Sequence, residues 1–82
     1  MLFRSVERRD LEPGLLSVNA IPWGSVYLDG RPVGNTPQID LPVTPGAHRL
    51  RVEREGYRPY DRPVDVASGQ RLRITDIALV ER

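Results

Sequence analysis

The sequence contains no cysteine, no lysine, one histidine and one tryptophan among its 82 residues. Without cysteine, neither disulfide bonds nor thiolate metal ligands can brace the core of so short a chain. A catalytic triad or a zinc site needs several ligands or partners, and His48 has no second histidine to join it. We therefore expect a domain that rests on apolar packing, with no catalytic residues, no metal and no cofactor.

The charges of the chain are nearly balanced, because 12 arginines and 11 acidic residues give a net charge of +1. A dedicated nucleic-acid binder usually carries a basic field, so this balance argues against a nucleic-acid partner. No apolar run approaches the roughly 18 residues of a membrane span. Residues 1–5 lack the apolar core of a secretory signal. The length predicts a single domain, and the lack of a long apolar run predicts no membrane span in this sequence.

Residues 1–12 carry charge without apolar periodicity, and we expect a flexible leader there, followed by one domain over residues 13–82. Residues 2–5, Leu-Phe-Arg-Ser, also match the translated end of a common sequencing adapter. The sequence alone does not decide whether these residues are a native leader or an addition that derives from the adapter.

Short apolar runs separated by eight prolines and seven glycines follow one another along the chain, which is the rhythm of strands and turns. Apolar and polar residues alternate within the runs, and no window of twelve residues has helical periodicity. The pattern predicts an all-β fold, a small antiparallel β-sandwich of six to seven short strands. These strands are expected at residues 14–20, 25–29, 31–33, 38–42, 47–55, 58–66 and 71–80.

Several details of this sandwich can be predicted. Asp29-Gly30 is typical of a type I′ turn, which needs positive φ at both central residues. The two longest runs should pair as a hairpin that sets Arg49 and Arg51 across from Asp61 or Asp65. A change of parity near Thr75-Asp76 indicates a β-bulge. The alternation predicts that the following residues form the core: Leu16, Val18, Val26, Leu28, Ile39, Leu41, Leu50, Val52, Val64, Val66, Leu72, Ile74, Ile77 and Leu79.

The turns themselves resemble those of a known family. Residues 22–30, Pro-Trp-Gly-Ser-Val-Tyr-Leu-Asp-Gly, resemble the motif of the PEGA domain, although Trp23 stands where that family usually has glutamate. Three further elements follow in the family's order: Val-Gly-Asn-Thr-Pro at 33–37, Pro-Gly-Ala-His at 45–48 and Glu-Gly-Tyr at 55–57. The resemblance covers about residues 14–80.

The resemblance implies a small β-sandwich of the kind found in bacterial envelope and surface proteins, including the extracytoplasmic ends of receptor-type serine/threonine kinases. It implies no catalytic residues. We therefore expect a non-enzymatic interaction or spacer module, a fragment or C-terminal part of a larger envelope-associated protein. Its partner would be a protein or a cell-wall glycan, and its location extracytoplasmic.

Trp23 is the strongest candidate for a contact residue, because a tryptophan in a Pro-x-Gly turn should be partly exposed. Tyr27, on the outer face of its strand, would extend the same contact surface. The alternative is that Trp23 folds back as a lid over the sandwich. A carbohydrate-binding module that uses Trp23 is the second functional hypothesis. For Glu53 and Glu55, a solvated charged face is favoured over acid–base chemistry, and His48 is expected to be a packed residue at a strand start.

Overall fold

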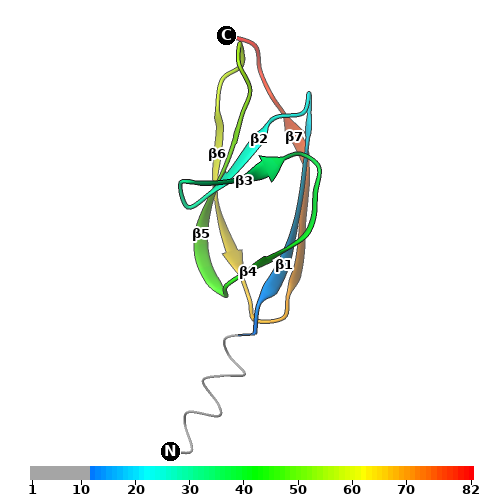
Figure 1. Cartoon of the computed structure of the whole chain (residues 1–82), viewed down its shortest axis with the longest axis vertical. Helices are drawn as coiled ribbons and strands as arrows, with labels where there is room; N and C mark the ends of the chain where they lie inside the picture. The colour runs from blue at the N-terminus through cyan, green and yellow to red at the C-terminus, as the bar shows by residue number, and fades with distance from the viewer. Residues whose placement is uncertain (1–11) are drawn as a thin grey trace, which may run out of the picture.

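The computed structural model describes residues 12–82, so the predicted leader and its adapter alternative lie outside the described residues except for Glu12. Residues 12–82 form seven strands and no helix (Figure 1). They hold no helix with the length and apolarity that a membrane crossing needs. The strands are β1 (Gly14–Ile21), β2 (Ser25–Leu28), β3 (Arg31–Asn35), β4 (Gln38–Val43), β5 (Gly46–Glu53), β6 (Tyr60–Val66) and β7 (Arg71–Ala78).

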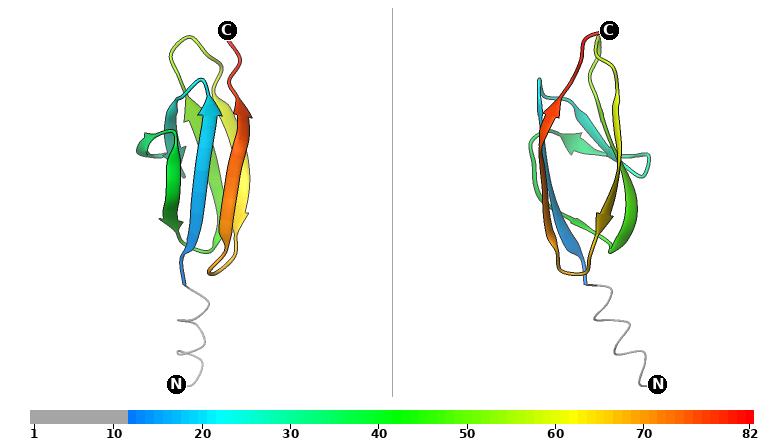
Figure 2. Two further views of the ribbon diagram at one scale, coloured as in Figure 1. Left: turned by 90° about the vertical axis from the view of Figure 1, so that its right-hand side faces the viewer. Right: turned by 180° about the vertical axis from the view of Figure 1, so that it is seen from behind.

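The strands form two facing sheets, one with the order β4-β1-β7 and one with the order β3-β2-β5-β6 (Figure 2). This confirms the predicted sandwich. The proline-containing strand β3 lies at an edge, where a residue without an N–H is tolerated. All pairs are antiparallel except β1 and β7, which are parallel. Because the first and last strands run in the same direction, the described chain begins at one end of the sandwich and leaves at the other (Figure 1).

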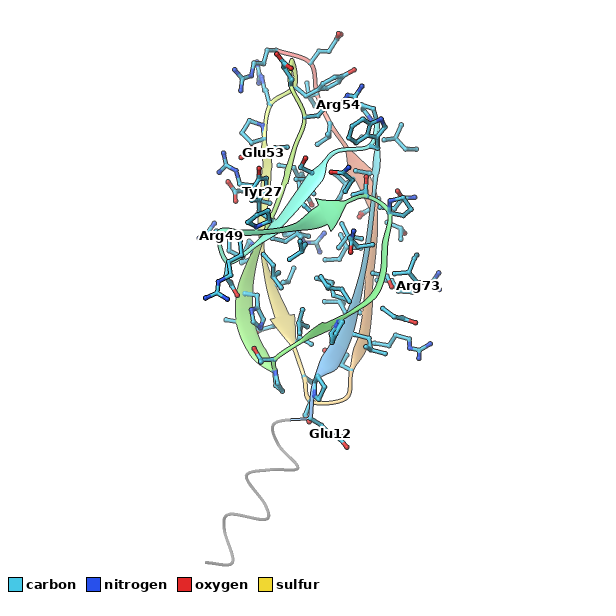
Figure 3. All side chains as sticks on the ribbon, in the orientation of Figure 1. Glu12, Tyr27, Arg49, Glu53, Arg54 and Arg73 are labelled. Atoms are coloured by element: carbon cyan, nitrogen blue, oxygen red, sulfur yellow. The ribbon has the colours of Figure 1, made fainter. Side chains whose placement is uncertain are left out.

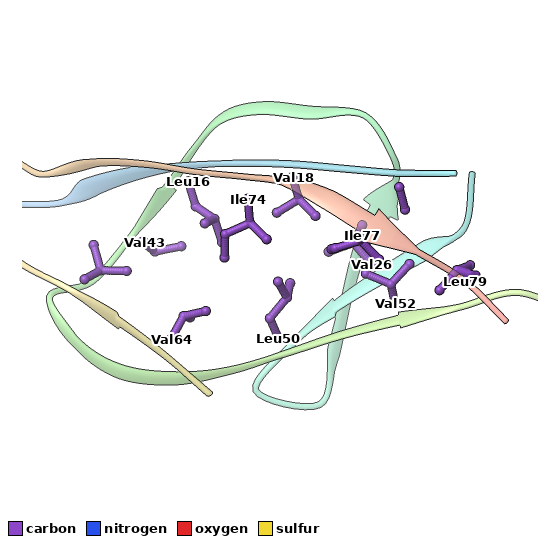
Figure 4. Close-up of a cluster of buried hydrophobic side chains, with 12 residues drawn as sticks. Leu16, Val18, Val26, Val43, Leu50, Val52, Val64, Ile74, Ile77 and Leu79 are labelled. Atoms are coloured by element: carbon purple, nitrogen blue, oxygen red, sulfur yellow. The ribbon is translucent and has the colours of Figure 1, made fainter. Parts of the chain in front are cut away.

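The core lies between the two sheets and is built from alternate residues of their inner faces (Figure 4). Five side chains are completely enclosed, namely those of Leu16, Val18, Val26, Leu50 and Val52. Most of the predicted core is confirmed, with Leu28, Leu41 and Leu72 partly buried at its margin. Ala20 and Val43 also belong to it. With no disulfide, burial of these apolar side chains is the main force that holds the sheets together.

One predicted core residue is wrong: the Ile39 side chain is 71% exposed. Leu16 pairs with Leu41 but Val18 pairs with Gln38, so Ile39 and Asp40 together lie opposite Ser17 as a bulge. Asp40 has a φ of 52°, and its backbone N–H donates to the Ser17 hydroxyl at 3.0 Å. The bulge turns Ile39 outward, because one extra residue shifts the inward parity of the strand.

The second bulge was predicted correctly. Val18 pairs with Ile74 while Ala20 pairs with Ile77, so the extra residue of β7 lies at Thr75-Asp76. Its effect is to keep both Ile74 and Ile77 buried, although they are an odd number of residues apart.

The predicted turn and hairpin are also present. Asp29 and Gly30 have φ values of 53° and 83°, as a type I′ turn requires. Strands β5 and β6 pair in antiparallel register, with Arg51 directly opposite Asp61. The Arg51 guanidinium donates to the Asp61 carboxylate at 2.9 Å between Nη1 and Oδ2. Both side chains are well exposed, so this ion pair contributes little stability.

Candidate functional site

The aromatic–arginine cluster is formed by Trp23, which precedes β2, and by Arg54 and Tyr57, which follow β5. Its arginine is labelled in Figure 3. The carbon at the centre of the Arg54 guanidinium is 4.4 Å from the centroid of the Trp23 ring and 5.9 Å from that of Tyr57. Arg54 Nη1 also donates to the Trp23 carbonyl oxygen at 3.3 Å. These contacts hold the guanidinium over both rings, an arrangement that combines cation–π attraction with a hydrogen bond.

The tryptophan of this cluster stays open to partners, because 54% of the surface of Trp23 is exposed. The structure does not bring Tyr27 to it. Tyr27 lies on the outer face of β2, where the register sets it opposite Pro32 on one side and Arg51 on the other. Trp23 and Tyr27 therefore belong to neighbouring but separate groups, one at the end of the sandwich and one on the sheet face.

Arg54 was not identified from the sequence. Because Arg54 lies between Glu53 and Glu55 in sequence, the pattern indicated only a solvated, charged strand face. The signal lies in the register instead: Ser25 pairs with Glu53, so the residue that follows Glu53 comes next to the residues that precede Ser25. That register cannot be read from a single sequence.

A shallow depression of about 490 Å³ adjoins the cluster. All of its lining residues except Pro59 are charged or polar, and the lining consists of Ser25, Arg51, Glu53, Arg54, Glu55, Tyr57, Pro59 and Arg82. The Glu53 carboxylate accepts a hydrogen bond from Arg51 Nε, and the same arginine bonds Asp61. One of the two carboxylates considered for acid–base work is therefore held in an exposed ion pair. The depression offers a polar surface for contact beside an exposed aromatic ring.

His48 lies at the other end of β2 from the cluster, and both of its ring nitrogens face acceptors. Nδ1 is 2.5 Å from Asp29 Oδ2, and Nε2 is 2.6 Å from the backbone carbonyl oxygen of Thr44. Only the protonated ring donates from both nitrogens, so this geometry favours the imidazolium form of His48. The side chain of His48 is 11% exposed, as expected for a packed residue, and it ties the β2–β3 turn to β5.

A third contact joins the loop before β2 to the loop after β3. Gly24 N–H donates to the buried Thr36 hydroxyl at 3.1 Å, and Thr36 N–H donates to the Gly24 carbonyl at 2.9 Å. A Cβ on residue 24 would come within 2.7 Å of the Glu53 carbonyl oxygen, so only glycine fits this approach. We call this reciprocal pair the Gly24–Thr36 clasp.

These contacts link the sequence elements that resemble the PEGA motif. The Pro-x-Gly element is hydrogen-bonded to Thr-Pro, and Asp-Gly is hydrogen-bonded to the histidine of Pro-Gly-x-His. The tyrosine of Gly-Tyr is part of the aromatic–arginine cluster. The model of the family described as PEGA domain matches residues 13–80. The chain belongs to the PEGA domain family. No curated protein and no solved structure matches it. In this PEGA domain, the motif residues Gly24, Thr36, Asp29 and His48 join loops to one another, while Trp23 is a large motif side chain that is more than half exposed.

Within residues 12–82 of this PEGA domain, no group of three or more histidine, cysteine or acidic side chains is placed to hold a metal ion. The chemistry at its surface is instead that of ion pairs and aromatic stacking.

The His48–Asp29 pair should make the stability of the domain depend on pH. The pKa of His48 is raised above its ordinary 6.5, chiefly by the hydrogen bond to Asp29 and then by the Thr44 carbonyl. The pKa of Asp29 is lowered from its ordinary 3.8, chiefly by the bond to His48. The contribution of His48 is therefore complete below 6.5 and is lost as the pH rises through its raised pKa. That of Asp29 is lost as the pH falls through its lowered pKa.

We predict that the free energy of unfolding in urea will fall as the pH rises above about 6.5 and through the raised pKa of His48, and that His48→Gln will flatten this fall. Asp29→Asn is the matched control, because Asn-Gly keeps the type I′ turn but removes the carboxylate. It should flatten the fall as well. An unchanged pH profile in His48→Gln would show that the pair is not the origin.

Proposed function

We propose that this PEGA domain is a non-catalytic interaction and spacer module of a larger bacterial envelope-associated protein, such as a receptor-type serine/threonine kinase or a surface protein. The observation that carries the proposal is the parallel pairing of β1 with β7. It sets the two ends of residues 12–82 at opposite ends of the sandwich (Figure 1). A module connected in this way adds its full length to the chain on either side of it.

The chemistry of the surface supports a non-catalytic role. Both nitrogens of the His48 ring are engaged, and the Glu53 carboxylate is paired with Arg51. A general base needs a lone pair that is free to take a proton from a substrate. The His48 ring and the Glu53 carboxylate thus already have partners within the domain, and the end loops supply the contact surface.

The spacer proposal is tested by measuring the distance between spin labels at residues 12 and 82. The chain has no cysteine, so Glu12→Cys and Arg82→Cys label these sites alone. Roughly twelve extended residues along the long axis predict a separation of about 35–45 Å with a narrow distribution. The control pair, Glu12→Cys with Ala67→Cys, should give a short distance, because both residues lie at the same end. A broad or short distribution for the first pair would contradict the spacer.

A carbohydrate-binding module that uses Trp23 is the alternative, and the exposure of this ring favours it. Aromatic rings of this kind stack on sugars, and the neighbouring Arg54 and Glu55 offer hydrogen bonds to hydroxyl groups. Binding to purified peptidoglycan sacculi that is lost in Trp23→Ala would favour this function. Tyr27→Ala is the matched control, because Tyr27 lies in a different group. Absence of binding in the unmodified chain would rule out the alternative.

A further inference from the structure

The pairing of the first strand with the last extends over nearly their whole lengths. The register runs from Leu15 opposite Arg71 to Ile21 opposite Ala78. Two further backbone bonds extend it at its ends, Leu15 N–H to the Gln70 carbonyl at 2.8 Å and Leu79 N–H to the Ile21 carbonyl at 2.9 Å. The first and the last strand of the domain are therefore hydrogen-bonded to each other along their whole paired length.

We propose that the β1–β7 pair is a mechanical clamp that resists tension applied through the two ends of the domain. Tension pulls β1 toward its first residue and β7 toward its last, so the two strands must slide past each other. Sliding loads all of their hydrogen bonds together, whereas separating two strands from one end loads one bond at a time. This inference rests on the spacer function, since only a module connected in line receives tension in this way.

Two features of the pair oppose sliding. The bulge at Thr75-Asp76 fixes the register, because a shift by one residue would turn the inward side chains of β7 outward. Beneath the pair, Leu16 and Val18 on β1 and Ile74 on β7 are almost completely buried in the core (Figure 4). Sliding would therefore break apolar packing as well as hydrogen bonds, and both costs arise at the same displacement.

A shorter contact lies on the path of the load before the clamp. The segment after β7 bonds to the β5–β6 turn through Arg58 N–H to the Val80 carbonyl at 2.8 Å and Arg82 N–H to the Gly56 carbonyl at 3.1 Å. Tyr57 and Glu81 form an antiparallel bridge there. This contact is much shorter than the β1–β7 pair, so it should yield first, after which the tension reaches the eight residues of β7.

The test is force spectroscopy with two pulling geometries on the same chain. Handles at Glu12→Cys and Arg82→Cys make β1 and β7 slide, and handles at Glu12→Cys and Ala67→Cys separate them from one end. A Cβ on Gly14 would come within 3.1 Å of the Ala67 carbonyl oxygen, so residue 67 lies next to the start of β1. We expect the first geometry to need more than about twice the unfolding force of the second, since forced unfolding follows the unfolding rate.

Equal forces in the two geometries would overturn the clamp. Leu15→Pro removes the N–H that bonds Gln70 and should lower the force in the first geometry. Thr36→Val, which weakens the domain outside the clamp, should leave that force nearly unchanged. The clamp and the spacer fail separately: a long label distance with equal forces removes the clamp alone, and a short label distance removes the spacer whatever the forces are.

Discussion

Replacing Leu50 with alanine will remove a large part of the stability of this PEGA domain. The side chain is completely buried at the centre of β5, where it faces the opposite sheet. Loss of a buried leucine costs about 2–5 kcal/mol, because apolar contact is lost and a cavity remains. A domain of this size has a total stability of about 4–12 kcal/mol. We expect the melting temperature, followed by far-UV circular dichroism, to fall by about 10 °C or more.

The matched control is Ile39→Ala, which removes an aliphatic side chain of the same size from the opposite sheet. Because Ile39 is mostly exposed, its loss should change the free energy of unfolding by no more than about 0.5 kcal/mol. The pair of variants also tests the register of β4. A large loss of stability in Ile39→Ala would mean that this side chain packs inside, as simple alternation predicts, and that the bulge is misplaced.

The alternation of apolar residues was sufficient to predict the sandwich, because facing sheets must bury one side of every strand. It failed at Ile39 for a local reason. The extra residue in β4 depends on Asp40 at positive φ and on the bond from its N–H to Ser17, a contact between residues 23 apart in sequence. In β7 the bulge could be predicted, since Leu72 and Ile74 differ in parity from Ile77 and Leu79. β4 has only Gln38 before its bulge, so no pair of apolar residues on the two sides of the bulge shows the change of parity.

The parallel pairing of β1 with β7 was not predicted, because periodicity identifies a strand but not its neighbour or its direction. The same holds for the candidate site. Exposure of Trp23 was predicted from its turn and is confirmed, while Arg54 reaches that ring only through the register of β2 with β5. A turn depends on a few adjacent residues, and a surface cluster depends on how distant strands are paired. This is why the turns could be predicted and the cluster could not.

Breaking the Gly24–Thr36 clasp should also lower the free energy of unfolding by a large amount. Thr36→Val keeps the size of the side chain but removes the hydroxyl that accepts the Gly24 N–H. A buried N–H left without an acceptor costs about 1–3 kcal/mol, so urea unfolding should show a loss of that size. Thr36→Ser keeps the hydroxyl and should lose less.

Thr75→Val makes the same chemical change at an exposed position of β7 and provides the comparison. It should be close to neutral, because valine suits an exposed strand and no clasp is broken. If Thr36→Val and Thr75→Val cost the same, the hydroxyl of Thr36 contributes nothing specific, and the joining of Pro-x-Gly to Thr-Pro would depend on the Thr36 N–H alone. If Thr36→Val costs more and serine restores the difference, the hydrogen bond itself explains why a threonine of one motif element lies against a glycine of another.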